Sequence, residues 1–164
     1  NLVSGTNPAP RFVAMEFDIS CQTSTSWSFP INISVGQLSG AGPYGGQLSN
    51  GTMAARLTIR TLGTNECAFV MGGNTSSAFS SSQTRHVLWV INTSGTTQSY
   101  VGPDGSSHIM ANATMDLWAD EDDVFLQVPR TGFNYNYLED FWFSFDLPGT
   151  YTIDNLTVRD LAAP

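Results

Sequence analysis

The chain has 164 residues, of which 12% are charged and 12% are aromatic, and its formal net charge is −8. All six cationic residues are arginine, so no basic face is available to neutralise phosphates, and we expect no nucleic-acid partner. The absence of lysine also excludes Schiff-base chemistry and a lysine-based phosphate-binding loop.

The length fits one domain over residues 1–164, with an extended N-terminal arm over residues 1–10. No apolar run approaches the roughly 20 residues that cross a bilayer, so we expect no membrane span. Because the chain begins at Asn1 without methionine or an apolar leader, we interpret it as a processed or excised extracellular domain. Serine, threonine, asparagine and glycine fill the polar positions, which favours strands over helices.

Four strands are predicted in the first half of the chain. In the first of them, residues 11–20, the apolar Val13 and Met15 alternate with Glu16 and Asp18 on the outer face. The other three cover residues 31–35, 53–62 and 67–71. The glycine-rich stretch 36–51 and the polar stretch 72–83 are predicted loops.

The second half begins with four more predicted strands, which cover residues 86–91, 98–101, 115–119 and 124–128. The acidic run 120–123 is predicted to be the turn of a hairpin, and residues 129–140 an exposed aromatic loop. With the closing strands described next, the chain has about ten short strands and no internal repeat. This pattern predicts an all-β fold, a two-sheet antiparallel β-sandwich.

The last two predicted strands cover residues 141–145 and 151–158, with a Pro-Gly turn between them, and we expect them to pair with each other. The apolar alternation of the second strand changes parity near Asp154 and Asn155. Such a change predicts a β-bulge or a change of sheet at this point.

Two cysteines, Cys21 and Cys67, are predicted to form a disulfide, although two free thiols remain the alternative. Closing so long a loop stabilises a fold by roughly 3 to 4 kcal/mol in the chain-entropy model.

Six N-x-S/T sequons exceed the roughly two or three that the serine and threonine content alone would produce. They begin at Asn32, Asn50, Asn74, Asn92, Asn112 and Asn155. The excess indicates a glycoprotein, while a bacterial or viral surface protein rich in serine, threonine and asparagine would give the same pattern without glycans.

Residues 86–160 resemble the second half of a concanavalin A-like or laminin G-like jelly roll. The resemblance rests on a strand that begins near a histidine, a tyrosine-bearing strand, a D-x-W strand, an acidic hairpin and a final strand containing IDNLTV. In the first half it rests on MEFDIS and the rhythm of the strands. It implies a jelly-roll sandwich of the kind used for extracellular sugar binding, often appended to glycoside hydrolases or polysaccharide lyases. Many relatives bind calcium.

The segment EFDIS is similar to the E-x-D-x-E strand of the laminarinase and agarase family of retaining glycosidases, but Ser20 replaces the third carboxylate. Retaining hydrolysis needs a nucleophile and an acid/base carboxyl about 5 to 5.5 Å apart. Since the acid/base is missing, we expect no enzymatic activity.

Glu16, Asp18 and Asp154 could meet if the first and last strands lie side by side, and three carboxylates would suit Ca²⁺. The alternatives are three solvated acids, or an Asp154 in a bulge whose side chain bonds to its own backbone. The acidic run 120–123 is a separate calcium candidate. His86 lacks a second ligand at zinc spacing and is interpreted as a structural residue.

The aromatic loop combines ring faces with hydrogen-bonding groups, as a shallow sugar site requires. The predicted carbohydrate-binding residues are Arg130, Asn134, Tyr135, Asn136 and Tyr137, supplemented by Tyr44 and Trp27. The alternative is that this loop packs over the core as a lid.

We therefore predict a non-catalytic, extracellular, carbohydrate-binding jelly-roll module whose partner is a polysaccharide or glycan. The alternative is a structural subunit of an extracellular filament, fimbria or viral surface that self-assembles through β-strand contacts.

Overall fold

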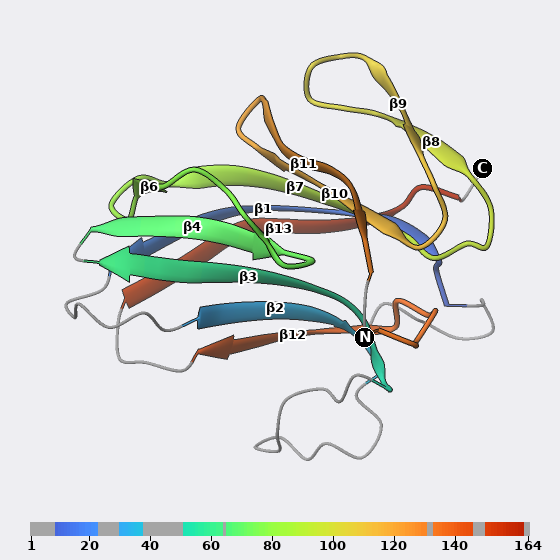
Figure 1. The fold of residues 1–164 in the computed structure, drawn as a ribbon, viewed down its shortest axis with the longest axis horizontal. Helices are drawn as coiled ribbons and strands as arrows, with labels where there is room; N and C mark the ends of the chain where they lie inside the picture. Colours follow the sequence, from blue (N-terminus) through green and yellow to red (C-terminus); the bar gives the residue numbers. More distant parts are fainter. Residues whose placement is uncertain are drawn as a thin grey trace.

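The computed structural model describes residues 9–22, 30–37, 51–63, 65–130, 133–145 and 150–162, and its regular structure consists of β-strands. These strands form two antiparallel sheets that pack face to face, with a smaller two-stranded hairpin above them (Figure 1). The predicted all-β, two-sheet sandwich is therefore confirmed. The part of the chain that is described contains no helix with the length and hydrophobicity needed to cross a membrane.

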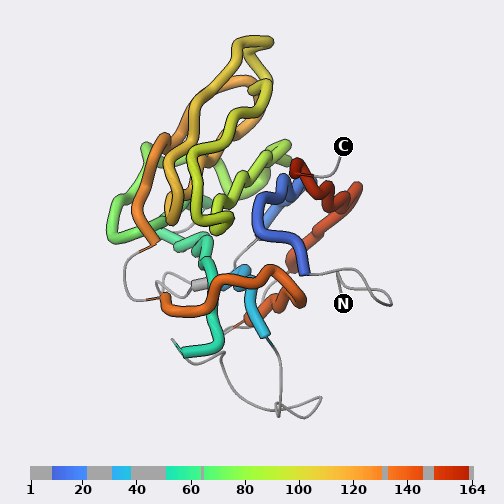
Figure 2. Tube along the Cα trace, turned by 90° about the vertical axis from the view of Figure 1, so that its right-hand side faces the viewer, coloured from blue at the N-terminus to red at the C-terminus, as the bar shows by residue number. Residues whose placement is uncertain are grey.

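Sheet A has five strands, in the spatial order β11-β10-β7-β1-β13. They are β1 (Phe12–Gln22), β7 (Arg85–Asn92), β10 (Thr114–Ala119), β11 (Asp122–Pro129) and β13 (Thr150–Asp160). Strand β1 pairs with β13, so the first and last described strands do lie side by side, as the calcium hypothesis required (Figure 2).

Sheet B has six strands, in the order β12-β2-β3-β4-β5, with β6 also paired to β4. They are β2 (Pro30–Gly36), β3 (Met53–Gly63), β4 (Glu66–Met71), β5 (Asn74–Thr75), β6 (Phe79–Ser80) and β12 (Asp140–Phe145). The short strands β5 and β6 lie within the stretch predicted to be a loop, because two residues each show no alternation to detect.

The predicted pairing of the last two strands is wrong. Strand β12 pairs with β2 in sheet B, whereas β13 pairs with β1 in sheet A. Apolar alternation shows which face of a strand is buried, and that face turns toward the same core from either sheet. The pattern therefore did not show that these two strands belong to opposite layers.

The main core lies between the two sheets and takes the odd-numbered side chains of β1. Trp89 of β7 and Phe17 of β1 are fully buried there, together with Phe69 of β4. Such residues alternate with polar ones on strands of both sheets, which explains why the sandwich was readable from the sequence.

A second apolar cluster covers part of the outer face of sheet A. The hairpin formed by β8 (Gln98–Val101) and β9 (Ser107–Met110) rises over that face in both views (Figures 1 and 2). The cluster comprises Phe12, Ala14, Leu88, Val90, Tyr100, Met110 and Trp118. Strand β9 was not predicted, because its sequence SHIM carries no alternation that distinguishes it from the preceding turn.

The predicted bulge in the last strand is confirmed. The register between β1 and β13 shifts between Glu16 and Asp18, and Asn155 adopts a left-handed conformation with φ of 53°. Asparagine tolerates this conformation better than most residues. The shift accounts for the change in parity along β13.

Cys21 of β1 and Cys67 of β4 are both buried and bring their side chains within hydrogen-bonding distance across the core. The contact with Cys21, together with burial, raises the pKa of the Cys67 thiol. Both residues are described as free thiols, so the disulfide stays a prediction.

Candidate functional site

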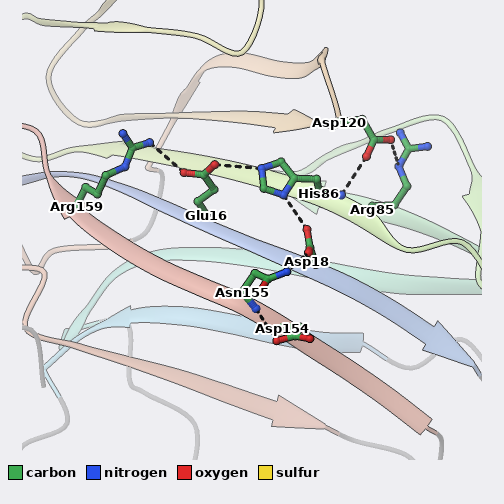
Figure 3. Close-up of polar contacts among 8 residues, drawn as sticks. All are labelled: Glu16, Asp18, Arg85, His86, Asp120, Asp154, Asn155 and Arg159. Carbon is green, nitrogen blue, oxygen red and sulfur yellow. Dashed lines mark hydrogen bonds and ion pairs between the residues drawn. The ribbon is translucent and has the colours of Figure 1, made fainter.

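The part of the outer face of sheet A that the hairpin leaves open carries a line of polar side chains, which we call the polar row (Figure 3). It consists of Glu16 and Asp18 from β1, His86 from β7, and Asn155 and Arg159 from β13. Alternation along β1 points Glu16 and Asp18 outward, and the strand register places His86 and Asp154 on either side of Asp18.

His86 lies at the centre of the row and bridges the two carboxylates. Its Nδ1 is 2.7 Å from Oδ1 of Asp18, and its Nε2 is 3.1 Å from Oε1 of Glu16. A carboxylate only accepts hydrogen bonds, so both contacts are hydrogen bonds when both ring nitrogens carry protons. The bond to Asp18 is the main reason that the pKa of His86 is raised above its ordinary value.

The remaining carboxylate oxygens are bound by residues of β13. Nδ2 of Asn155 donates to Oδ2 of Asp18 at 2.6 Å, and a terminal nitrogen of Arg159 donates to Oε2 of Glu16 at 3.0 Å. The pKa of Asp18 is lowered, first by the bond from Asn155 and then by the bond from His86. Each of the four oxygens thus has one donor, which fixes the row before any ligand arrives.

The structure does not bring the three predicted calcium ligands together. Asp154 stands opposite Asp18, but its Oδ1 accepts a hydrogen bond from the backbone N–H of Asn155 at 2.8 Å. His86 bridges the other two predicted ligands, and within the described residues no group of three or more His, Cys, Asp and Glu side chains is placed to hold a metal ion. Arg159, and His86 when its ring is protonated, supply the positive charge that a cation was expected to supply, so calcium binding here stays a prediction.

An ion pair at the start of β7 borders the polar row. Nε of Arg85 lies 3.1 Å from Oδ2 of Asp120, and the other oxygen of Asp120 accepts the backbone N–H of His86 at 3.0 Å (Figure 3). Asp120 has a left-handed φ of 59°, where the chain turns from β10 into β11. Beyond this pair lies a cavity of about 280 Å³, lined in part by Asp122 and Asp123 of the predicted acidic run.

Arg130, predicted to bind sugar, is instead buried and holds the aromatic loop in place. One terminal nitrogen donates to the backbone oxygens of Ala54 and Tyr135, each at 2.7 Å, and the other donates to Oδ1 of Asn136 at 2.8 Å. Arg130 is only 9% exposed, and these three bonds tie its two terminal nitrogens to its own chain, so it holds the loop and does not face solvent.

The other predicted residues of the loop divide between the two interpretations. Tyr135 packs against the core, and burial is the main reason that its pKa rises to about 12. Asn134, Asn136 and Tyr137 are exposed, and the guanidinium of Arg11 lies 4.7 Å from the centre of the Tyr137 ring. Arg130 and Tyr135 therefore pack over the core, as the lid interpretation predicted, whereas Tyr137 faces solvent. The supplementary residues Tyr44 and Trp27 lie outside the described residues.

Of the five sequon asparagines among the described residues, two are buried. Asn32 is 7% exposed and accepts a hydrogen bond from Thr58, and Asn92 is fully buried with Nδ2 directed at three backbone oxygens. A glycan has no room at either position. Asn74, Asn112 and Asn155 are exposed, and Asn50 lies outside the described residues.

The sequence did not predict that His86 contacts Glu16 and Asp18. Its partners stand 68 and 70 positions earlier in the chain, and only the register between β1 and β7 brings them into contact. The one available signal was that His86 begins a predicted strand. In an antiparallel pair with residues 11–20, an outward-facing histidine there can lie beside the outward-facing Glu16 and Asp18.

No protein-family model matches the chain, and no curated protein gives a significant match. Among solved structures, the chain is similar to a protein named sialidase, with 14% sequence identity and a TM-score of 0.54. The similarity covers 94% of this chain and 14% of that chain, so the chain spans a small part of the length of that protein. At this level of identity the likeness concerns the β-sandwich fold.

Proposed function

We propose that the chain is a non-catalytic, extracellular carbohydrate-binding module of jelly-roll type, and that the polar row contacts the sugar. The observation that carries this proposal is the row itself, in which Glu16, Asp18, His86, Asn155 and Arg159 are held by contacts of 2.6–3.1 Å. Side chains that are already fixed lose little conformational entropy when a ligand binds.

The row keeps hydrogen-bonding capacity for a ligand. Each oxygen of Glu16 and Asp18 accepts one bond within the row and retains a second lone pair for a sugar hydroxyl. The side chain of Arg159 is 59% exposed, so its guanidinium can donate to the oxygen of the same or the next hydroxyl. Acceptors and donors side by side suit the adjacent hydroxyl groups of a sugar ring.

The fold supports the same proposal at a coarser level. The protein named sialidase contains a sandwich of this shape within 14% of its length, as expected of a module that accompanies other parts of a longer chain. We propose that the chain is not catalytic because of one residue. Ser20 occupies the position at which the glycosidases that EFDIS resembles have their third carboxylate.

A polysaccharide pull-down and a glycan array test the proposal. We expect the wild-type protein to be retained on at least one polymer, and His86→Ala and Arg159→Ala to reduce retention about tenfold or more. Arg60→Ala is the matched control, since Arg60 is an exposed arginine on sheet B. Folded wild-type protein that no polymer retains, or a loss of retention equal in the control, would contradict the proposal.

Self-assembly as a structural subunit is the alternative function, and it would use the edge strand β13. This strand ends sheet A and is 11 residues long. Its bulge at Asn155 and its charged Arg159 and Asp160 are features that natural proteins use to protect sheet edges from pairing. Electron microscopy and sizing of native material separate the two functions, because regular polymers would favour assembly.

A further inference from the structure

The cavity at the end of the sandwich has walls from both sheets. From sheet B it is lined by Phe79 of β6 and by Ser77 and Ala78, which precede that strand. From sheet A it is lined by Arg85 and Asp122. Its volume of about 280 Å³ is near the lower limit for small-molecule sites, so it suits a single ring of a larger ligand.

The apolar wall of this cavity includes the ring of Phe79, which packs between two neighbouring side chains. The Phe79 ring stacks on Phe69 with centroids 4.7 Å apart, and the guanidinium of Arg85 lies 5.6 Å from the centre of the Phe79 ring. Arg85 is held in turn by its ion pair with Asp120. A half-buried aromatic ring fixed in this way offers apolar surface to the C–H groups of a sugar ring at little entropic cost.

The polar wall of the cavity is acidic. Asp122 and Asp123 are exposed acidic residues in the cavity lining, and the one arginine in the lining already faces Asp120. Carboxylates accept hydrogen bonds from hydroxyl or ammonium groups and repel other carboxylates. The chain's net charge of −8 adds to this repulsion.

The cavity is also connected to the polar row. Asp120 holds Arg85 of the cavity through one oxygen and the backbone N–H of His86 in the row through the other (Figure 3). The two sites therefore border each other around the start of β7.

We infer that this cavity is a binding site for one neutral or amino-substituted hexose unit, with the ring beside Phe79 and its hydroxyl or ammonium groups on Asp122 and Asp123. The inference deepens the proposed function and rests on it, since it names the class of sugar. It predicts that sugars carrying a carboxylate, such as uronic acids, are disfavoured.

The test is calorimetric titration of the whole chain with three probes, namely a neutral gluco-oligosaccharide, a glucosamine oligosaccharide and an oligogalacturonate. We expect binding of the first or second probe and at least tenfold weaker binding of the third. The double variant Asp122→Asn/Asp123→Asn should lose about tenfold in affinity, which is the usual effect of losing a hydrogen bond to a charged group.

Matched controls separate a site effect from a general change in charge or folding. Glu121→Gln removes a charge from the same turn without touching the cavity lining, and it should bind within twofold of wild type. Ala78→Trp fills the cavity without changing its charge and should also lose at least tenfold, whereas Ala111→Trp, at an exposed alanine elsewhere, should not. Thermal melts establish that each variant is folded.

The outcomes distinguish this inference from the proposed function. Binding that His86→Ala abolishes but Ala78→Trp leaves within twofold of wild type would overturn the cavity site and leave the polar row standing. Equal or tighter binding of the oligogalacturonate would overturn the assigned sugar class. No binding of any of the three probes by folded wild-type protein would overturn the cavity site, and retention on no polymer at all would overturn the proposed function as well.

Discussion

The hydroxyl of Tyr100 donates a hydrogen bond of 2.7 Å to the carboxylate of Asp116 beneath the β8–β9 hairpin. The same hydroxyl accepts the indole N–H of Trp118 at 2.9 Å, and the backbone N–H of Gln127 donates to the other oxygen of Asp116 at 2.6 Å. Asp116 is 1% exposed, and this burial raises its pKa. A satisfied polar network inside the second apolar cluster thus fastens the hairpin to sheet A.

We expect Tyr100→Phe to lower the free energy of unfolding by about 1–3 kcal/mol, because it leaves the buried Asp116 and Trp118 without one partner each. Urea unfolding measures the effect. Tyr137→Phe removes the same hydroxyl from an exposed tyrosine and should change stability by less than about 0.5 kcal/mol. Equal effects of the two variants would show that the network does not stabilise the hairpin.

Cys21 and Cys67 should be oxidised to a disulfide in secreted protein, because the fold already places both side chains in contact across the core. Intact-mass measurement after alkylation without reductant should detect no added alkyl groups. Reduction should then lower the free energy of unfolding by roughly 3 to 4 kcal/mol. Two alkyl groups on protein that was denatured without reductant would contradict the bridge.

The sequence predicted the faces of the strands better than their neighbours. Alternation in β1 correctly placed Glu16 and Asp18 on the outer face, and the parity change in β13 correctly located the bulge at Asn155. Both are local properties of a strand with one buried face. The partner of each strand depends on packing in three dimensions, so the pairing of β12 with β13 was predicted wrongly and the contact of His86 was not predicted at all.

Buried polar side chains were the other source of error. Arg130 and Asn92 carry groups that are usually exposed, yet each is buried and donates to backbone oxygens of other segments. Whether such a residue faces solvent or holds a loop depends on oxygens supplied by distant segments, such as that of Ala54 for Arg130. Composition and spacing do not contain that information.

If the chain is produced in a secretory pathway that attaches N-glycans, we expect them at Asn74 and Asn112 and none at Asn32 or Asn92. Glycopeptide mapping measures the occupancy. Asn92→Gln should also destabilise the fold by more than about 1 kcal/mol, because Asn92 donates to backbone oxygens that no other side chain at that position would satisfy equally well. A glycan on Asn92 in folded protein would contradict the burial of this side chain.

His86 bridges the carboxylates of Glu16 and Asp18. Calcium bound by these two residues and Asp154 would therefore have to compete with the protonated His86 ring. We therefore expect millimolar CaCl₂ to raise the melting temperature more at pH 8 than at pH 6, relative to EDTA. Asp154→Asn should abolish the shift at pH 8. If the melting temperature at pH 8 is equal in EDTA and in CaCl₂, even after the protein has been refolded in chelator, no stabilising calcium binds.

The pair formed by His86 and Asp18 should make stability depend on pH in a defined direction. The folded-state pKa of His86 is raised, so its contribution is full below its unfolded pKa of about 6.5 and is lost as pH rises through the folded-state pKa. The folded-state pKa of Asp18 is lowered, so its contribution is present above about pH 3.9 and is lost as pH falls through its folded-state pKa. Both contributions are present together between roughly pH 4 and 6.5.

We therefore expect the stability lost in His86→Ala to be largest near pH 5–6 and to shrink above pH 7. The His86 side chain is 45% exposed, so solvent screening should limit the loss to about 1 kcal/mol or less. Proton NMR titration of the ring measures the cause directly, with a midpoint above 6.5 in the wild type that falls in Asp18→Asn. Arg60→Ala removes an exposed charge from sheet B and should leave the midpoint in place. A wild-type midpoint at or below 6.5 would show that the bridge does not hold the second proton on His86.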